Sequence, residues 1–537
     1  MIVWPGRAHP SGMPKSKDAM QPPNILLIQA DQMAAQALPM YGHAVVQAPN
    51  LQHLADRGTT FENAYCNNPV CAPSRFSMMS GQLASRIGAY DNAAEFPASI
   101  PTFAHYLRDL GYKTCLSGKM HFVGPDQLHG FEERLTTDIY PSDFGWTPDW
   151  TQQDPPMAPS VMSMRGVVEA GICKRSLQLD YDDEVAFASV KKIYDYARDT
   201  DERPFFLTAS FTHPHNPFTI TQEYWDRYEH DEIDMPSVPF IPYEDRDAWS
   251  QRYYKLIRQD EHSVSDEAIR VARHAYYGMI SYVDDQVGKL LSALDDTGLG
   301  DNTIIVFTAD HGDMMGERGM WYKFNPFEWS VRVPLIIASP EGAVGNRVDH
   351  GVSLVDLLPT FLDLATQGTP PEVIDPIDGN SLTQLLNGPN ADRADEVMIE
   401  FMGEGVHSPC LILRRDGFKY VYCEDDPGML FDLNNDPREL VNLCGQPEFA
   451  QLEADLLADI LDRWDPTTIK TDVLQSQRRR RYLQSVLLKG NRAAWDYEPY
   501  RDASREFVRS AKDANTTMTK GLARFPYMEP VPPDTPR

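Results

Sequence analysis

Four short apolar segments of the chain are each followed by side chains that can bind metals, bind anions or move protons. The side chains that follow the four segments are Asp31, Lys119 with His121, His213 with His215, and Asp310 with His311. Carboxylates and imidazoles are common metal ligands, histidine is the commonest acid–base catalyst, and lysine binds anions. One polar residue after a strand is ordinary loop chemistry. Four clusters of these types predict a shared site.

The segment Cys71-Ala-Pro-Ser-Arg75 is the second chemical signal. It is followed by Ser80-Gly-Gln82 and Arg86, and it precedes an expected helix. A free cysteine is most often a small buried hydrophobe, so Cys71 by itself has a purely structural interpretation. A five-residue pattern becomes informative only together with the other clusters.

The elements that must position these residues form an α/β pattern. Five short apolar runs are predicted as buried strands: 24–30, 113–117, 205–211, 303–309 and 335–338. Helical spacing of apolar residues follows from Ala186 to Ala197 and from Ala272 to Leu294. Alternating strands and helices predict a mainly parallel sheet flanked by helices, and such sheets bind ligands beyond the carboxyl ends of their strands.

We expect four sections along the chain. Residues 1–22 read as a loose arm, 23–395 as the main α/β domain, and 396–464 as a small antiparallel subdomain with strands at 411–414, 418–423 and 429–432. Residues 465–537 are expected to hold a helix around Val473–Leu488 and a tail for oligomerisation. The basic run Arg478–Arg481 resembles a nucleic-acid patch, but a solvated or subunit-facing helix surface is favoured.

Charge and cysteine content restrict the partners. The chain has 49 Lys+Arg and 78 Asp+Glu, a net charge of −29, which argues against nucleic-acid and anionic-membrane partners. We see neither an apolar run long enough for a membrane helix nor the apolar region of a signal peptide. Seven cysteines are few for this length and odd in number, so we expect no disulfide framework and a cytoplasmic location.

Taken together, these motifs resemble the sulfatase family, whose marker is C-x-P-S-R. Gly118-Lys-Met-His121 is similar to its G-K-x-H motif, and Thr308-Ala-Asp-His-Gly312 with Gly316-Glu-Arg-Gly319 to its metal segment. The resemblance implies the alkaline-phosphatase/sulfatase-like fold, a large mainly parallel sheet flanked by helices plus a small C-terminal antiparallel sheet.

The resemblance also implies the catalytic chemistry. A formylglycine-generating system would oxidise Cys71 to an aldehyde, whose hydrate carries two hydroxyls on one carbon. One hydroxyl attacks sulfur and forms a covalent sulfate ester; the other loses a proton and expels sulfate. Arg75 would hold the modified residue, His121 would take the second proton, and His215 with Lys323 would protonate the leaving alcohol.

One divalent metal is implied beside that nucleophile. Its expected ligands are Asp31, Gln32 through its amide oxygen, Asp310, His311 and the modified Cys71. Oxygen ligands suit calcium or magnesium, whereas the imidazole favours manganese. Lys119 and Lys323 are expected to bind sulfate oxygens, and Asn92 to hydrogen-bond the substrate.

Longer stretches resemble the choline-sulfatase branch of the family: 90–95, 117–134, 138–149 and 495–497. The implied substrate is choline O-sulfate or a similar small ester, whose quaternary ammonium binds aromatic faces and a carboxylate. Tyr140, Trp146 and Trp150 crowd one segment, and Trp146 is the residue that the resemblance selects. Residues 154–174 depart from the branch pattern. The branch also implies a homotetramer in which residues 490–525 close a neighbouring site.

Two alternatives stay open at this point. One is a related arylsulfatase or a phosphonate or phosphate monoester hydrolase that shares the metal site. The other, of a different class, is an inactive scaffold or binding protein in which Cys71 stays unmodified. Comparing the turnover of choline O-sulfate with that of aryl sulfates and phosphonate esters tests the first alternative. The mass of the peptide that carries residue 71 tests the second, because it shows whether Cys71 is modified.

Overall fold

The computed structural model describes residues 22–152, 163–386, 388 and 393–490, which belong to one compact unit. Its centre is an eight-stranded sheet in the order β10-β2-β9-β8-β1-β6-β3-β4. The strands are β1 (Asn24–Ala30), β2 (Thr59–Tyr65), β3 (Lys113–Gly118), β4 (Glu133–Arg134), β6 (Phe205–Ser210), β8 (Thr303–Ala309), β9 (Leu335–Ala338) and β10 (Asn346–Ser353). All neighbours pair in parallel except β9, which is antiparallel to β8 and β2.

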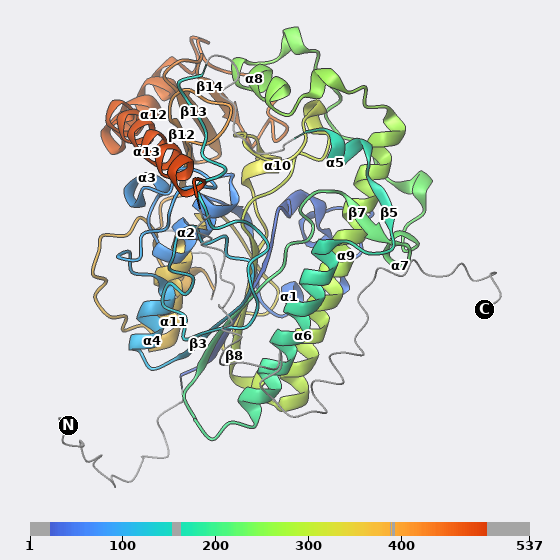
Figure 1. Cartoon of the computed structure of the whole chain (residues 1–537), viewed down its shortest axis with the longest axis vertical. Helices are drawn as coiled ribbons and strands as arrows, with labels where there is room; N and C mark the ends of the chain where they lie inside the picture. The colour runs from blue at the N-terminus through green and yellow to red at the C-terminus, as the bar shows by residue number, and fades with distance from the viewer. Residues whose placement is uncertain (1–21, 153–162, 387, 389–392, 491–537) are drawn as a thin grey trace. The chain divides into compact units, whose positions relative to one another are not determined.

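The central strands are buried along their whole length, which explains their continuous apolar sequence. Helices cover both faces of the sheet (Figure 1). One layer contains α1 (Pro49–Asp56), α6 (Leu177–Ala197) and α9 (Asp266–Thr297); the other contains α2 (Cys71–Ser80), α4 (Phe103–Asp109) and α11 (Leu357–Thr366). The predicted α/β class and the five predicted strands are therefore confirmed.

Three structural features were not predicted. Strands β2 and β10 both have mixed polar and apolar sequences, so neither contains a clear apolar run. Their pairing also has a register irregularity between Val348 and Gly351. Strand β9 was expected, but its reversed direction was not. Short helices also occupy the connections: α3 (Ala84–Ile87), α5 (Arg165–Val168), α7 (Gln222–Trp225), α8 (Ala248–Leu256) and α10 (Glu328–Val331), while β5 (Gly171–Cys173) pairs with β7 (Thr219–Thr221).

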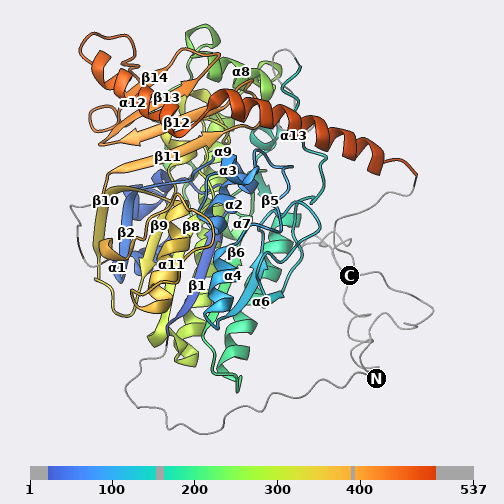
Figure 2. The same ribbon diagram turned by 90° about the vertical axis from the view of Figure 1, so that its left-hand side faces the viewer.

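The C-terminal part of the described chain forms the small antiparallel sheet (Figure 2). It contains β11 (Glu396–Phe401), β12 (Cys410–Arg415), β13 (Phe418–Cys423) and β14 (Met429–Asp432), followed by α12 (Ala450–Arg463) and α13 (Pro466–Leu487). Three of its strands and α13 were predicted. Strand β11 was not, and α12 was covered only by the expectation that 396–464 form an α+β subdomain, without bounds for a helix. The domain boundaries at residues 395 and 464 stay predictions. Residues 1–21 and the tail beyond 490 lie outside the described residues.

All seven cysteines are free, as expected from their number. Among the described residues, no helix combines the length and the apolar character that crossing a membrane requires.

A buried ion triad joins the small sheet to the main domain. Lys419 on β13 contacts Glu328 at 2.8 Å and Glu439 at 2.5 Å, and it donates to the Pro326 carbonyl at 2.7 Å. The Lys419 side chain is fully buried. Because Pro326 follows the segment that carries Lys323, the triad also fixes a part of the chain with predicted catalytic residues.

Substituting Lys419→Ala should therefore lower the free energy of unfolding by about 3–5 kcal/mol, because two buried carboxylates lose their cation. Urea denaturation measures this change. Lys470→Ala is the matched control, since Lys470 forms partly exposed pairs with Glu424 and Asp425 and should cost less than about 1 kcal/mol. Equal effects of the two substitutions would contradict a structural role for the triad.

Candidate active site

The predicted site residues meet at the carboxyl edge of the large sheet. Asp31 follows β1, Lys119 follows β3, and Asp310 follows β8. These strands are neighbours or share the neighbour β6, and they run in parallel, so their ends lie side by side. Gly118 permits the turn into Lys119: its φ is +103°, and a Cβ atom there would lie 1.9 Å from the Ser210 carbonyl oxygen.

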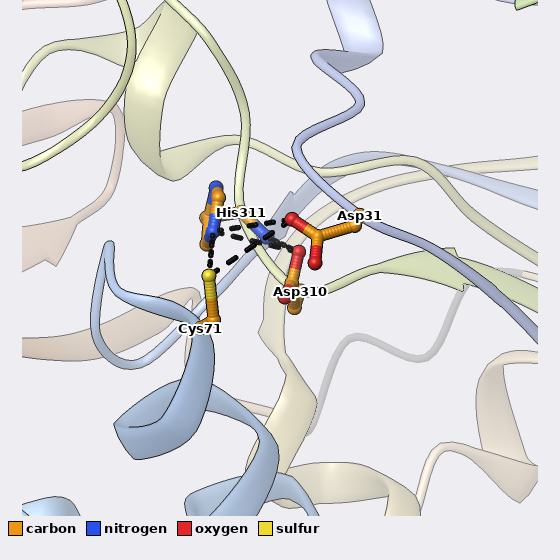
Figure 3. Close-up of side chains that lie close together, drawn as sticks. All are labelled: Asp31, Cys71, Asp310 and His311. Atoms are coloured by element: carbon orange, nitrogen blue, oxygen red, sulfur yellow. Dashed lines mark hydrogen bonds and ion pairs between the residues drawn. The ribbon is translucent and has the colours of Figure 1, made fainter. Parts of the chain in front are cut away.

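Cys71 is the first residue of α2 and points at the same strand ends (Figure 3). Its Sγ lies 3.2 Å from His311 Nε2 and 3.9 Å from Asp31 Oδ1. His311 Nε2 lies 3.8 Å from Asp31 Oδ1 and 3.6 Å from Asp310 Oδ1. One atom from each of these four buried side chains falls within 4.8 Å of the others. Residues far apart in the sequence thus form one compact set of ligand atoms.

Arg75 lies one helical turn after Cys71 and connects the acidic residues. Its Nε donates to Asp310 Oδ2 at 2.7 Å and one terminal nitrogen to Asp31 Oδ2 at 3.2 Å. The other terminal nitrogen donates to the Lys119 carbonyl at 2.6 Å and to Ser210 Oγ at 2.9 Å. The guanidinium is completely buried. It therefore neutralises two carboxylates and joins the ends of several strands.

The charges of the site shift the pKa values of the ligand atoms. Burial alone would raise the pKa of Asp31, and the Cys71 thiolate would raise it too, but Lys119, His215 and Arg75 lower it to about 2. Burial likewise opposes ionisation of Cys71, yet Lys119, Lys323 and His311 hold its pKa well below the usual value for a thiol. The site therefore favours an anion at residue 71, which is what a nucleophile at this position needs.

Lys323 and His215 also lie close to Cys71. Lys323 Nζ lies 3.4 Å from Cys71 Sγ and 2.8 Å from His215 Nε2. His215 Nδ1 lies 2.7 Å from the Asn216 carbonyl oxygen, so Nδ1 carries the hydrogen and Nε2 accepts from Lys323. Burial and the charge of Lys323 lower the pKa of His215. The pair can therefore pass a proton to an oxygen beside Cys71.

Gln32 and Lys119 form contacts with other protein side chains at the atoms expected to bind the metal and the sulfate. The side-chain oxygen of Gln32 accepts from Lys323 Nζ at 2.6 Å, and its amide donates to Asp313 Oδ2 at 2.5 Å. Lys119 Nζ contacts Asp31 directly. Gln32 as a metal ligand and Lys119 as a sulfate ligand stay predictions.

A cavity of about 410 Å³ opens beside Cys71. Asn92, His121, His215 and Lys323 are among its polar lining residues. Asn92 Oδ1 accepts from the Ala72 backbone amide at 2.9 Å, near the start of α2. Both ring nitrogens of His121 are buried and have no partner among the described residues. His121 nevertheless helps to lower the pKa of Cys71, so its ring lies within reach of residue 71.

Much of the remaining cavity lining is aromatic or apolar. It consists of Ile139, Tyr140, Trp146, Leu177, Pro217 and Phe324, together with Glu404. The Tyr140 and Trp146 rings are 5.6 Å apart. Trp150 does not line this cavity; it is buried and donates its indole N–H to the Gly403 carbonyl. His213, from the same segment as His215, is held at 2.6 Å by Asp182 and does not line the cavity.

Glu404 is the cavity residue that sequence reasoning missed. It lies in the loop between β11 and β12, far from every recognised motif, and no local pattern marks it. Burial, with the charge of nearby Asp91, raises its pKa to about 8. A buried carboxylate in an otherwise aromatic pocket suits a cationic group of the ligand.

The four-residue set fits a divalent metal. Asp31, Asp310 and His311 provide two carboxylates and an imidazole, the donor types that calcium or a transition metal accepts. Cys71 Sγ stands where the oxygen of a modified residue 71 would lie. Asp31 and Asp310 have no exposed surface, and a divalent cation between them would offset their mutual repulsion.

Fold, cavity and ligand set together define a sulfuric ester hydrolase, and the chain belongs to the sulfatase family. The family model described as Sulfatase matches residues 23–367. A model of the N-sulphoglucosamine sulphohydrolase C-terminus matches 316–464, and one described as Choline sulfatase enzyme C terminal matches 471–525. Metal dependence and a formylglycine nucleophile are general features of this family.

Individual relatives agree with this assignment. The choline-sulfatase of Rhizobium meliloti is 44 % identical over 501 residues, 92 % of this chain and 97 % of that protein. An arylsulfatase of Clostridium perfringens is 30 % identical, covering 82 % and 93 %. The crystal structure of phosphonate monoester hydrolase from Agrobacterium radiobacter superposes with a TM-score of 0.67 at 25 % identity, covering 84 % and 96 %.

Substituting Asp31→Asn should remove at least about nine-tenths of the bound divalent metal, because the set loses one of its two charged oxygen ligands. Metal analysis of the purified protein by mass spectrometry measures the content. Glu404→Gln is the matched control, since it removes a buried cavity carboxylate outside the set and should leave the metal content unchanged. Full metal occupancy in Asp31→Asn would exclude this site.

Proposed function

We propose that the protein hydrolyses choline O-sulfate to choline and sulfate. The observation that carries this proposal is the lining of the cavity beside Cys71, which combines groups suited to an anion with groups suited to a cation. His121, His215 and Lys323 belong to the first kind, and Tyr140, Trp146 and Glu404 to the second. Choline O-sulfate carries both charges, an anionic sulfate at one end and a quaternary ammonium at the other. The choline-sulfatase name of the 44 % identical relative supports the same assignment.

The substrate would bind with its sulfate beside residue 71. Lys323, Lys119 and Asn92 are the proposed partners of the sulfate oxygens, since amine and amide hydrogens stabilise negative charge in a buried site. At the other end the methylated ammonium has no hydrogen-bond donor. It would lie against the faces of Trp146 and Tyr140 and be balanced by Glu404.

We assign the proton transfers to His215 and His121, the two histidines that interact with residue 71 besides His311. His215, held in one tautomer by the Asn216 carbonyl, receives a hydrogen bond from Lys323, and this pair would protonate the departing choline oxygen. His121, which helps to lower the pKa of residue 71, would accept a proton from it. Once Cys71 is converted to formylglycine, its hydrate would supply the hydroxyl nucleophile.

We further propose that Asp31, Asp310 and His311 hold the metal, with modified residue 71 and Gln32 as the remaining expected ligands. The metal would lower the pKa of the nucleophilic hydroxyl and neutralise sulfate charge. Calcium, manganese and magnesium all accept carboxylates, but the His311 imidazole favours manganese. Arg75 would keep both carboxylates in position. The cytoplasmic location and the homotetramer with its 490–525 tail stay predictions.

The test compares substrates on protein whose residue 71 has been characterised. Mass spectrometry of the peptide with residue 71 should show a loss of about 18 Da on conversion of thiol to aldehyde, and Cys71→Ala should reduce turnover by at least about 10⁴-fold with the fold intact. The modified enzyme should prefer choline O-sulfate to 4-nitrophenyl sulfate and to a phosphonate monoester in kcat/KM. Preference for the aryl ester or the phosphonate would refute the choline assignment, and an unmodified thiol in active enzyme would refute the nucleophile.

Glu404 predicts a pH dependence that is specific to a cationic substrate. Because its pKa is about 8, Glu404 is mostly protonated in the free enzyme at neutral pH. The carboxylate that attracts a cation forms as the pH rises through 8. The value of kcat/KM for choline O-sulfate should therefore rise by about tenfold between pH 7 and pH 9, relative to that for 4-nitrophenyl sulfate. Glu404→Gln should abolish this relative rise. An unchanged ratio in the wild-type enzyme would argue against cation binding at Glu404.

A further inference from the structure

The basic run of α13 is divided by the helix into exposed and buried side chains. Arg478, Arg479 and Arg481 are exposed, whereas Arg480 is 4 % exposed. The expectation of a solvated surface therefore holds for three of the four residues. Burying an arginine is costly unless a partner compensates its charge, so Arg480 needs a specific role.

Arg480 is paired with Asp91 on both carboxylate oxygens. Its two terminal nitrogens lie 2.6 Å from Asp91 Oδ1 and 2.7 Å from Asp91 Oδ2. One of them also donates to Thr147 Oγ1 at 3.3 Å, and Nε donates to Ser476 Oγ at 3.1 Å. Asp91 has no exposed surface. This bidentate geometry fixes both the distance and the relative orientation of the guanidinium and the carboxylate, which a lysine cannot do.

Two of the three residues whose side chains Arg480 contacts are each adjacent to a residue of the cavity wall. Asp91 precedes Asn92, and Thr147 follows Trp146. Helix α13 supports the same wall at a second point: Gln477 accepts from the Trp150 backbone amide at 3.0 Å. Trp150 in turn donates to the carbonyl of Gly403, the neighbour of Glu404. A helix close to the end of the described chain thus supports three cavity residues.

The ion pair also controls the charge next to Glu404. After burial, Asp91 makes the largest contribution to the raised pKa of Glu404, so the two carboxylates interact. Without the guanidinium, Asp91 would be a buried and uncompensated anion beside the cavity. The loops that carry it would have to move to hydrate it.

We infer that Arg480 is a positioning residue that holds Trp146 and Glu404 in place for the cationic end of the substrate. The inference rests on the proposed function, because it assumes that a cation occupies this end. Arg480 does not line the cavity. It acts through Asp91, Thr147 and the rest of the α13 contact.

The test compares two sulfate esters with Arg480→Gln. The KM for choline O-sulfate should rise by about tenfold, the size of one desolvated cation–π contact, because the cation-binding wall shifts. The kcat for choline O-sulfate and both constants for 4-nitrophenyl sulfate should stay within about twofold, because Asn92, although it follows Asp91, is also held by the Ala72 backbone amide, and Arg480 contacts no other group around residue 71. The formylglycine content of each preparation is checked by mass spectrometry.

Three variants separate positioning from general destabilisation. Arg479→Gln changes an exposed arginine of the same run and should leave both esters unaffected. Arg480→Lys keeps the charge but not the double contact and should give an intermediate KM. The double variant Asp91→Asn with Arg480→Gln replaces the ion pair by neutral amides. Its KM for choline O-sulfate should fall back close to the wild-type value, because no buried charge remains unpaired.

If Arg480→Gln lowers kcat/KM equally for both esters, or changes it for neither, Arg480 does not have the positioning role. A failure of the proposed function is recognised separately, from the wild-type enzyme. If that enzyme does not prefer choline O-sulfate, the assigned substrate is wrong whatever Arg480→Gln does. If it does and Arg480→Gln leaves the ratio of the two esters unchanged, only the inference about Arg480 fails.

Discussion

The site depends on one interaction, the contact of the Arg75 guanidinium with the carboxylates of Asp31 and Asp310. Two buried anions side by side repel each other strongly, and a fully buried cation with a planar fork of donors can satisfy both. The same side chain reaches the Lys119 carbonyl and Ser210 Oγ. One arginine therefore connects the ends of β1, β8, β3 and β6.

This contact also explains the spacing within the cysteine motif. Cys71 and Arg75 are four residues apart on α2, so they lie on the same face of the helix, one turn from each other. When Arg75 docks on the two carboxylates, Cys71 at the helix start is directed to the metal-ligand set. The positive end of the helix dipole then adds to the field of Lys119 and Lys323 at residue 71. The position and the electrostatic environment of the nucleophile thus have the same origin.

Much of this arrangement could be predicted because it is local in sequence. Buried parallel strands are continuous apolar runs, so β1 and β8 and the polar residues at their ends were recognisable. The antiparallel direction of β9 depends on the long connection before it, and β2 owes its place to its partners rather than to its sequence. The orientation of Gln32 is set by Lys323, Glu404 comes from the other sheet, and only docking decides that Arg480 is the buried arginine of its run. These features depend on tertiary contacts that no local pattern encodes.

The burial of Cys71 has a consequence for the order of events during protein synthesis. In the folded chain its side chain is 2 % exposed, enclosed by groups that a modifying enzyme would have to displace. Its contact partner His311 is 240 positions later in the chain. At about 5–20 residues per second, a ribosome needs on the order of 10–50 seconds to make that interval. During this time the thiol lacks its enclosing partners, so the nascent polypeptide would offer the best opportunity for the proposed conversion to formylglycine.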